Sequence, residues 1–166
     1  TEDEDVSTAV AAAFRAAGIA VHEDFGSIES FEEAPGGVRM NFSKDGLRGS
    51  AEAAVVVVAV GWTAGTAGLD LAKAGVDINP RGFVSVHSAL RTTAPHIFAA
   101  GDVTGRLMLV PQAMQDGFVA ATNAVRGPLL VNEDDVVAPI GSFTDPEYPQ
   151  VGMTEAKARE SHDVVV

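Results

Sequence analysis

The chain has 166 residues, 46% of them hydrophobic, a formal net charge of −12 at pH 7 and no cysteine. The hydrophobic content argues against disorder, and the length is enough for a sizeable core. The negative charge opposes binding to nucleic acid or to an anionic membrane. The longest apolar run, residues 53–60, is far too short to cross a bilayer, and the acidic start is unlike a signal peptide. Without cysteines nothing argues for secretion, so we expect a cytoplasmic location.

The first third of the chain contains one helical pattern and several strand patterns. The predicted elements are a helix at residues 6–17, which ends at Gly18, and four strands, at residues 19–21, 28–33, 38–43 and 55–60. Residues 28–43 form a meander, and Asp45-Gly46 supplies a turn after it. The run 55–60 is β-branched and has no polar face, which predicts a strand covered on both sides. We interpret the acidic cluster at residues 29–33 as a solvated face.

The middle of the chain ends in the most regular helical pattern. We expect a short helix at residues 69–74, closed by Gly75, and a turn at residues 79–82. Two strands at residues 83–86 and 97–100 and a long helix at residues 111–126 follow. The long helix begins with Pro111 and stops at Gly127. Its predicted core-facing stripe consists of Val110, Ala113, Met114, Gly117, Phe118, Ala121, Ala124 and Val125.

The last part of the chain reads as a separate module. Residues 129–135 are typical of a linker, and strands are predicted at residues 138–143 and 149–153. Thr154 is expected to cap a helix that begins at Glu155, and the chain stops in a strand-like run at residues 164–166.

The pair Gly101-Asp102 is the clearest candidate site. It follows a compact apolar run, and open α/β sheets bind ligands beyond the carboxyl ends of their strands. Gly101 permits a tight turn and close backbone approach, while Asp102 presents a hydrogen-bond acceptor. These properties suit a ligand rich in hydroxyl groups.

Strand, Gly-Asp, short loop and Pro-initiated helix together resemble the second flavin-binding motif of the pyridine nucleotide-disulfide oxidoreductases, the family of dihydrolipoamide dehydrogenase, glutathione reductase and mercuric reductase. Residues 143–147 and 151–156 are similar to the start of that family's interface domain. The resemblance implies an α/β fold class, namely a partial FAD/NAD(P)-binding Rossmann-like fold with a β-meander and the start of an α+β interface domain. It implies three parts: residues 1–62 from the NAD(P)-binding domain, 63–130 from the FAD-binding domain and 131–166 from the interface or dimerisation domain.

The same resemblance implies roles for particular positions. Asp102 matches the aspartate that accepts a hydrogen bond from a ribityl hydroxyl of FAD, and Gly101 lets the backbone approach that chain. Leu109 and Val110 match the segment beside the pyrimidine edge of the flavin. Gly61, which ends the apolar run, is the fifth candidate cofactor-binding residue. The implied cofactors are FAD, whose retention by this chain alone stays open, and NAD(P)H in the intact enzyme.

Several features of the family are missing from the sequence. It contains no G-x-G-x-x-G turn, no redox dithiol and no His followed five residues later by Glu. We therefore expect a fragment of an FAD-dependent NAD(P)H:disulfide (or related acceptor) oxidoreductase, inactive by itself and possessing no catalytic residue of its own. Two alternatives stay open: a fragment of a flavin-dependent NAD(P)H oxidase or ferredoxin reductase-like enzyme, and a non-catalytic binding or assembly module. A homodimer is plausible because the family's distal domain forms one.

Overall fold

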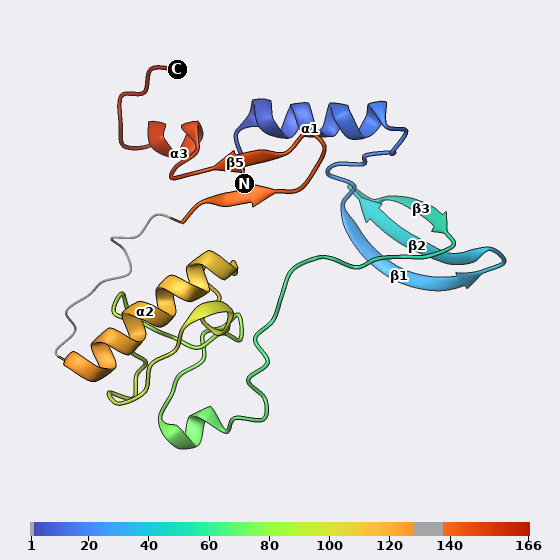
Figure 1. Cartoon of the computed structure of the whole chain (residues 1–166). Coiled ribbons are helices and arrows are strands. Elements are labelled where there is room, and N and C mark those ends of the chain that lie inside the picture. The colour runs from blue at the N-terminus through green and yellow to red at the C-terminus, as the bar shows by residue number, and fades with distance from the viewer. Residues whose placement is uncertain (1, 128–137) are drawn as a thin grey trace. The chain divides into compact units, whose positions relative to one another are not determined.

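The computed structural model describes residues 2–127 and 138–166, and it divides into two compact units (Figure 1). The meander unit comprises Thr8–Gly61. The helix–loop unit comprises Thr1–Ser7 with Trp62–Val166. Among the described residues, no helix combines the length and apolar character that a membrane span requires.

The first helix, α1, spans Glu4–Ala16, close to the predicted range. Acidic residues occupy its first turn and Arg15 its last, as the helix dipole favours. The strand predicted at residues 19–21 is wrong, because the Ile19 N–H donates to the Phe14 carbonyl at 3.0 Å. That amide completes the helix end and is not available to a β-ladder.

The meander is an antiparallel sheet of three strands in the order β1-β2-β3. Strands β1 (Ser27–Ala34) and β2 (Gly37–Lys44) confirm the two predicted strands, and the Asp45-Gly46 turn is confirmed by positive φ values of 51° and 80°. Strand β3 (Leu47–Ala53) was not predicted. Its residues are mostly small or charged and exposed, so the strand depends on pairing with β2 and not on a hydrophobic pattern of its own.

Side chains on β2 fix the meander register. Phe42 lies opposite Gly49, where a Cβ would stand 2.6 Å from the ring, and Phe25 packs edge-on against Phe42 at 5.6 Å between centroids. On the exposed side, Arg39 Nε donates to Glu52 Oε1 at 2.7 Å. This hydrogen bond and the charge of Glu52 raise the pKa of Arg39.

The prediction of a covered strand at residues 55–60 is wrong for this chain. The structure shows no strand there, and Val55, Val57, Val58 and Val60 are all exposed. A buried parallel strand needs neighbours on both edges and layers on both faces. Nothing in residues 2–127 or 138–166 pairs with this run as a ladder.

The helix–loop unit is built largely from turns. The 3₁₀ helix η1 (Leu71–Ala74) ends at left-handed Gly75 as predicted, but it begins two residues later than predicted, after the left-handed Asp70. The turn at 79–82 is confirmed by the Gly82 N–H, which donates to the Asn79 carbonyl at 2.9 Å. The strands predicted at residues 83–86 and 97–100 are wrong as strands, since they contribute only the isolated bridges Ile78↔Val84 and Arg91↔Phe98. Their other backbone bonds go to loops.

Two small apolar clusters form the core of this unit. The first centres on Val76, Val84 and Ala94, and the second on Leu90, Val119 and Ala120. Val86 packs against both clusters and so connects them. The segment that leads to the Gly-Asp turn is therefore held between the η1 loop and the long helix.

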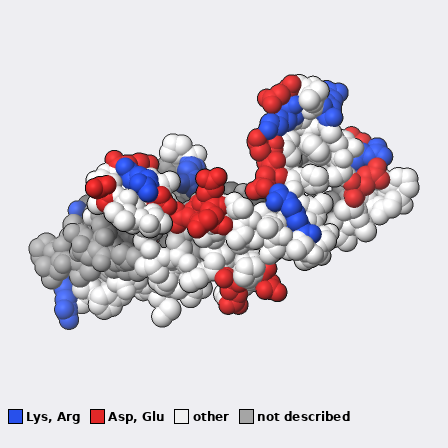
Figure 2. All heavy atoms as spheres, turned by 90° about the horizontal axis from the view of Figure 1, so that it is seen from above, with Lys and Arg blue, Asp and Glu red and all other residues white. Residues whose placement is uncertain are grey.

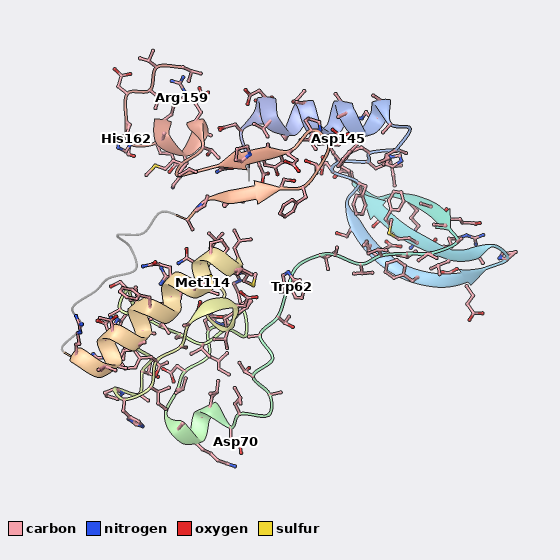
Figure 3. The ribbon with its side chains drawn as sticks, viewed as in Figure 1. Trp62, Asp70, Met114, Asp145, Arg159 and His162 are labelled. Carbon is pink, nitrogen blue, oxygen red and sulfur yellow. The ribbon has the colours of Figure 1, made fainter. Side chains whose placement is uncertain are left out.

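The long helix, α2, spans Val110–Arg126 and confirms the predicted bounds within one residue, but the predicted buried face is wrong. Met114, labelled in Figure 3, is 73% exposed, and Phe118 is 63% exposed. The buried residues of the helix are Gln112, Asp116, Val119, Ala120 and Asn123. Polar side chains prevail on this face because they bond to the backbone of the loops beneath, as Asn123 Nδ2 does with the Ala89 carbonyl at 3.1 Å.

The C-terminal part of the helix–loop unit carries a two-stranded antiparallel ladder and a short helix. Strands β4 (Ile140–Ser142) and β5 (Tyr148–Gln150) confirm the two predicted strands at reduced length, and α3 (Glu155–Arg159) begins after Thr154, whose Oγ1 accepts from the Lys157 N–H. The strand predicted at residues 164–166 is wrong, because no ladder forms there. The predicted linker at 129–135 lies outside the described residues.

Candidate functional site

The Gly101-Asp102 pair begins the 3₁₀ helix η2 (Gly101–Thr104), directly after an extended residue, Ala100. Gly101 is buried and has a φ of +73°. A Cβ at this position would stand 3.1 Å from the Cβ of Ala113 on α2. Both the conformation and the tight packing against α2 therefore favour glycine here.

A buried carboxylate joins this turn to the long helix. The Gly101 N–H donates to Asp116 Oδ2 at 3.0 Å, and Gln112 Nε2 donates to Asp116 Oδ1 at 2.7 Å. Asp116 is 0% exposed and Gln112 is 3% exposed. This contact was not predicted from the sequence. The available signal was the spacing of Gln112, Asp116 and Asn123, which places three polar residues on one helix face.

Three carbonyls of the turn also accept hydrogen bonds. Thr104 Oγ1 donates to the Gly101 carbonyl at 2.8 Å, the Gly105 N–H donates to the Asp102 carbonyl at 3.0 Å, and the Val84 N–H donates to the Val103 carbonyl at 2.9 Å. The turn is thus fixed before any ligand arrives, which reduces the entropy lost on binding.

Asp102 differs from Asp116 in having no protein partner. Its side chain is exposed and makes no hydrogen bond or ion pair with any described residue, while its backbone is held as above. An ionised carboxylate can only accept hydrogen bonds. The site therefore offers a rigidly mounted acceptor to a ligand that carries hydroxyl or N–H donors.

The amino end of α2 adjoins the same turn. Leu109, half-buried, is the N-cap and offers no side-chain acceptor, while Val110 is 74% exposed and Pro111 lies in the first turn. The first amides of a helix have no partner inside the helix and carry a partial positive charge. With no side-chain cap, this end is suited to a ligand atom that accepts a hydrogen bond or carries negative charge.

The structure brings together four of the five predicted site residues. Gly101 and Asp102 on η2 pack beside the first turns of α2, which begin at Leu109 and Val110. Gly61 belongs to the meander unit, where it is exposed with a φ of +117° and open space around its Cα. These four residues provide an acceptor and a helix terminus and include no nucleophile, so their chemistry suits binding and orientation.

Comparisons with known proteins show which family the chain resembles. The profile of a family described as pyridine nucleotide-disulphide oxidoreductase matches residues 1–117. A dihydrolipoyl dehydrogenase of Mycobacterium tuberculosis is 34% identical over 166 residues, covering 99% of this chain and 36% of that protein. One from Thermus scotoductus is 42% identical over 106 residues, covering 64% of this chain and 22% of that protein.

Two solved structures are similar to the chain. The HOCl-induced flavoprotein disulfide reductase RclA of Escherichia coli matches with a TM-score of 0.80 at 29% identity, over 97% of this chain and 36% of that one. LpdA of Mycobacterium tuberculosis matches with a TM-score of 0.79 at 25% identity, over 96% of this chain and 34% of that one.

The chain belongs to the pyridine nucleotide-disulfide oxidoreductase family, which confirms the predicted resemblance. The predicted fold class is confirmed too: a partial α/β Rossmann-like fold of the FAD- and NAD-binding type with an antiparallel meander. The chain spans 36% of the length of the tuberculosis dihydrolipoyl dehydrogenase that it matches.

Proposed function

We propose that this chain supplies the ribityl and pyrimidine contacts of a flavin site in an FAD-dependent, NAD(P)H-coupled oxidoreductase acting on a disulfide or related acceptor. The observation that carries the proposal is Asp102, a carboxylate with no partner among the described residues. It is mounted on a turn that is hydrogen-bonded through the Gly101 amide and the carbonyls of Gly101, Asp102 and Val103. The RclA structure, whose name identifies it as a flavoprotein disulfide reductase, supports the class.

Each residue of the site has a distinct part in binding. Asp102 accepts a hydrogen bond from a ribityl hydroxyl, and Gly101 leaves room for the chain to approach the backbone. Leu109 and Val110 place the amino end of α2 beside the pyrimidine edge, where its partial charge favours an anionic reduced ring. A stabilisation of about 0.3–2 kcal/mol there corresponds to roughly 6–40 mV for a two-electron couple. When bound, the flavin supplies the two-electron chemistry.

The rest of the chain is assigned by the same proposal. Residues 1–62 belong to the nicotinamide-binding part, with Gly61 as its cofactor contact, residues 63–130 to the flavin-binding part and residues 131–166 to an interface that forms a homodimer. The 166 residues contain no cysteine, so a dithiol relay has to come from outside them. We expect this chain to contribute flavin contacts and to catalyse no turnover by itself. We also expect a cytoplasmic location.

A flavin titration tests the proposal directly. FAD and FMN are titrated into the parent chain and into Asp102→Ala, with binding followed by flavin fluorescence and folding by far-ultraviolet circular dichroism. Losing a hydrogen bond to a charged acceptor weakens binding by about 1.5–3 kcal/mol, so we expect affinity to fall by about 10- to 150-fold.

Asp70→Asn is the matched control, because it removes the charge of an exposed carboxylate that pairs with Lys73 at 2.7 Å and lies at the N-cap of η1 and not in the Gly101-Asp102 turn. It should bind flavin as the parent does. The proposal fails if the parent shows no saturable flavin binding, or if Asp102→Ala binds as tightly as the parent.

A further inference from the structure

We propose that Asp116 is a positioning residue for the flavin-binding turn, acting through the Gly101 amide to fix the direction of Asp102. The inference rests on the proposed function, because Asp102 is there the ligand to the ribityl chain. Asp116 itself lies on the buried face of α2 and makes no contact with the ligand in this scheme.

The geometry around Gly101 carries the inference. The Gly101 N–H donates to Asp116 Oδ2 at 3.0 Å, and Thr104 Oγ1 donates to the Gly101 carbonyl at 2.8 Å. Gly101 has few steric limits on rotation about its own backbone bonds, and any change there would swing the Cα of Asp102. The two hydrogen bonds remove that freedom on both sides of Gly101.

Asp116 is itself locked in place. Gln112 Nε2 donates to its second oxygen at 2.7 Å, one turn earlier on the same helix. An unpaired buried carboxylate is strongly unfavourable, and even a paired one is often no more stabilising than an apolar side chain. Stability alone therefore explains this residue poorly, whereas an acceptor aimed at the Gly101 amide explains both its chemistry and its orientation.

The test compares Asp116→Ala with Asp116→Asn. Asparagine keeps an oxygen that can accept from the Gly101 N–H, while its amide nitrogen faces the Gln112 amide, which can turn to present its oxygen. Alanine keeps neither contact. In flavin-free protein, ¹⁵N-resolved hydrogen exchange should show the Gly101 amide exchanging about tenfold faster or more in Asp116→Ala and near the parent rate in Asp116→Asn. The Val119 amide on the same helix reports whether the helix itself has loosened.

Flavin affinity should follow the same order. We expect Asp116→Ala to bind FMN about tenfold more weakly, and Asp116→Asn to recover most of that loss. Met114→Ala, an exposed substitution on the same helix, should change neither quantity. If Asp116→Ala does not fold, Gln112→Met replaces it, because loss of the Gln112 donor should also speed Gly101 exchange.

The outcomes separate this inference from the proposed function. The inference is overturned if the Gly101 amide exchanges at the parent rate in folded Asp116→Ala, or in Gln112→Met where that variant replaces it. It is also overturned if Asp116→Asn restores neither the Gly101 exchange rate nor the flavin affinity. If Asp102→Ala loses flavin affinity while Asp116→Ala keeps it, only the positioning role is wrong. If Gly101 exchange responds as expected but the parent binds no flavin, the proposed function fails, and with it the role of Asp116 in binding.

Discussion

The ring of Phe83 occupies the space that a side chain on Gly105 would need: a Cβ there would stand 2.3 Å from Phe83 Cγ. Phe83 is 2% exposed, and the guanidinium of Arg81 lies over its ring at 5.4 Å. Gly105 closes η2 with a φ of 65°, so this contact connects the 79–82 turn to the end of the Gly101-Asp102 turn.

Gly105→Ala should destabilise the chain for two reasons. A left-handed alanine is unfavourable by about 1–2 kcal/mol, and the clash with Phe83 adds about 1–3 kcal/mol. Gly82→Ala is the matched control, because its φ is 87° but nothing lies within 4 Å of its Cβ. Urea unfolding followed by circular dichroism should show the larger loss for Gly105→Ala. Equal losses would mean that the Phe83 contact is unimportant.

Leu90 should be the most sensitive apolar residue of the helix–loop unit. It is 0% exposed and packs in one cluster with Val119 and Ala120. Leu90→Ala leaves a cavity, and we expect the free energy of unfolding to fall by about 2–5 kcal/mol. Leu69→Ala makes the same change at a side chain that is 61% exposed, and should stay within about 0.5 kcal/mol of the parent. Similar losses from both would contradict the observed core.

Asn123, on α2, should contribute to the free energy of unfolding through its side-chain hydrogen bond. Its Nδ2 donates to the Ala89 carbonyl at 3.1 Å, and the side chain is 2% exposed. Asn123→Ala leaves a buried carbonyl without this donor, so we expect a loss of about 1–3 kcal/mol in chemical unfolding. Met114→Ala on the exposed face is the control. A neutral Asn123→Ala would show that the contact contributes nothing.

Val57 is predicted to affect association and not stability. It is 84% exposed within a run of high β-propensity, and such runs pair with one another when uncovered. Val57→Glu adds negative charge to a chain already at −12, so sedimentation velocity should show less self-association. The unfolding midpoint should not move, whereas Val84→Glu, at a 4% exposed position, should abolish the cooperative transition. Destabilisation by Val57→Glu would show that the run is buried.

Local chemistry made several elements predictable from the sequence. Pro111 and Gly127 bound the long helix, Asp45-Gly46 specifies a hairpin turn, and Thr154 caps α3 through its own hydroxyl. These signals act within a few residues, so they need no knowledge of distant contacts. The family resemblance was likewise carried by short motifs around Gly101-Asp102.

The sequence by itself determined the family, the helices and the glycine turn that carries Asp102. Tertiary structure decided which face of α2 is buried, because the choice between Met114 and Asp116 depends on loop carbonyls and amides that the helical pattern does not reveal. It also decided that residues 55–60 form no strand, since a strand forms only where another strand supplies hydrogen bonds. A sequence pattern determines which local structures a segment can adopt, whereas its burial and strand pairing depend on the other segments that the fold packs against it.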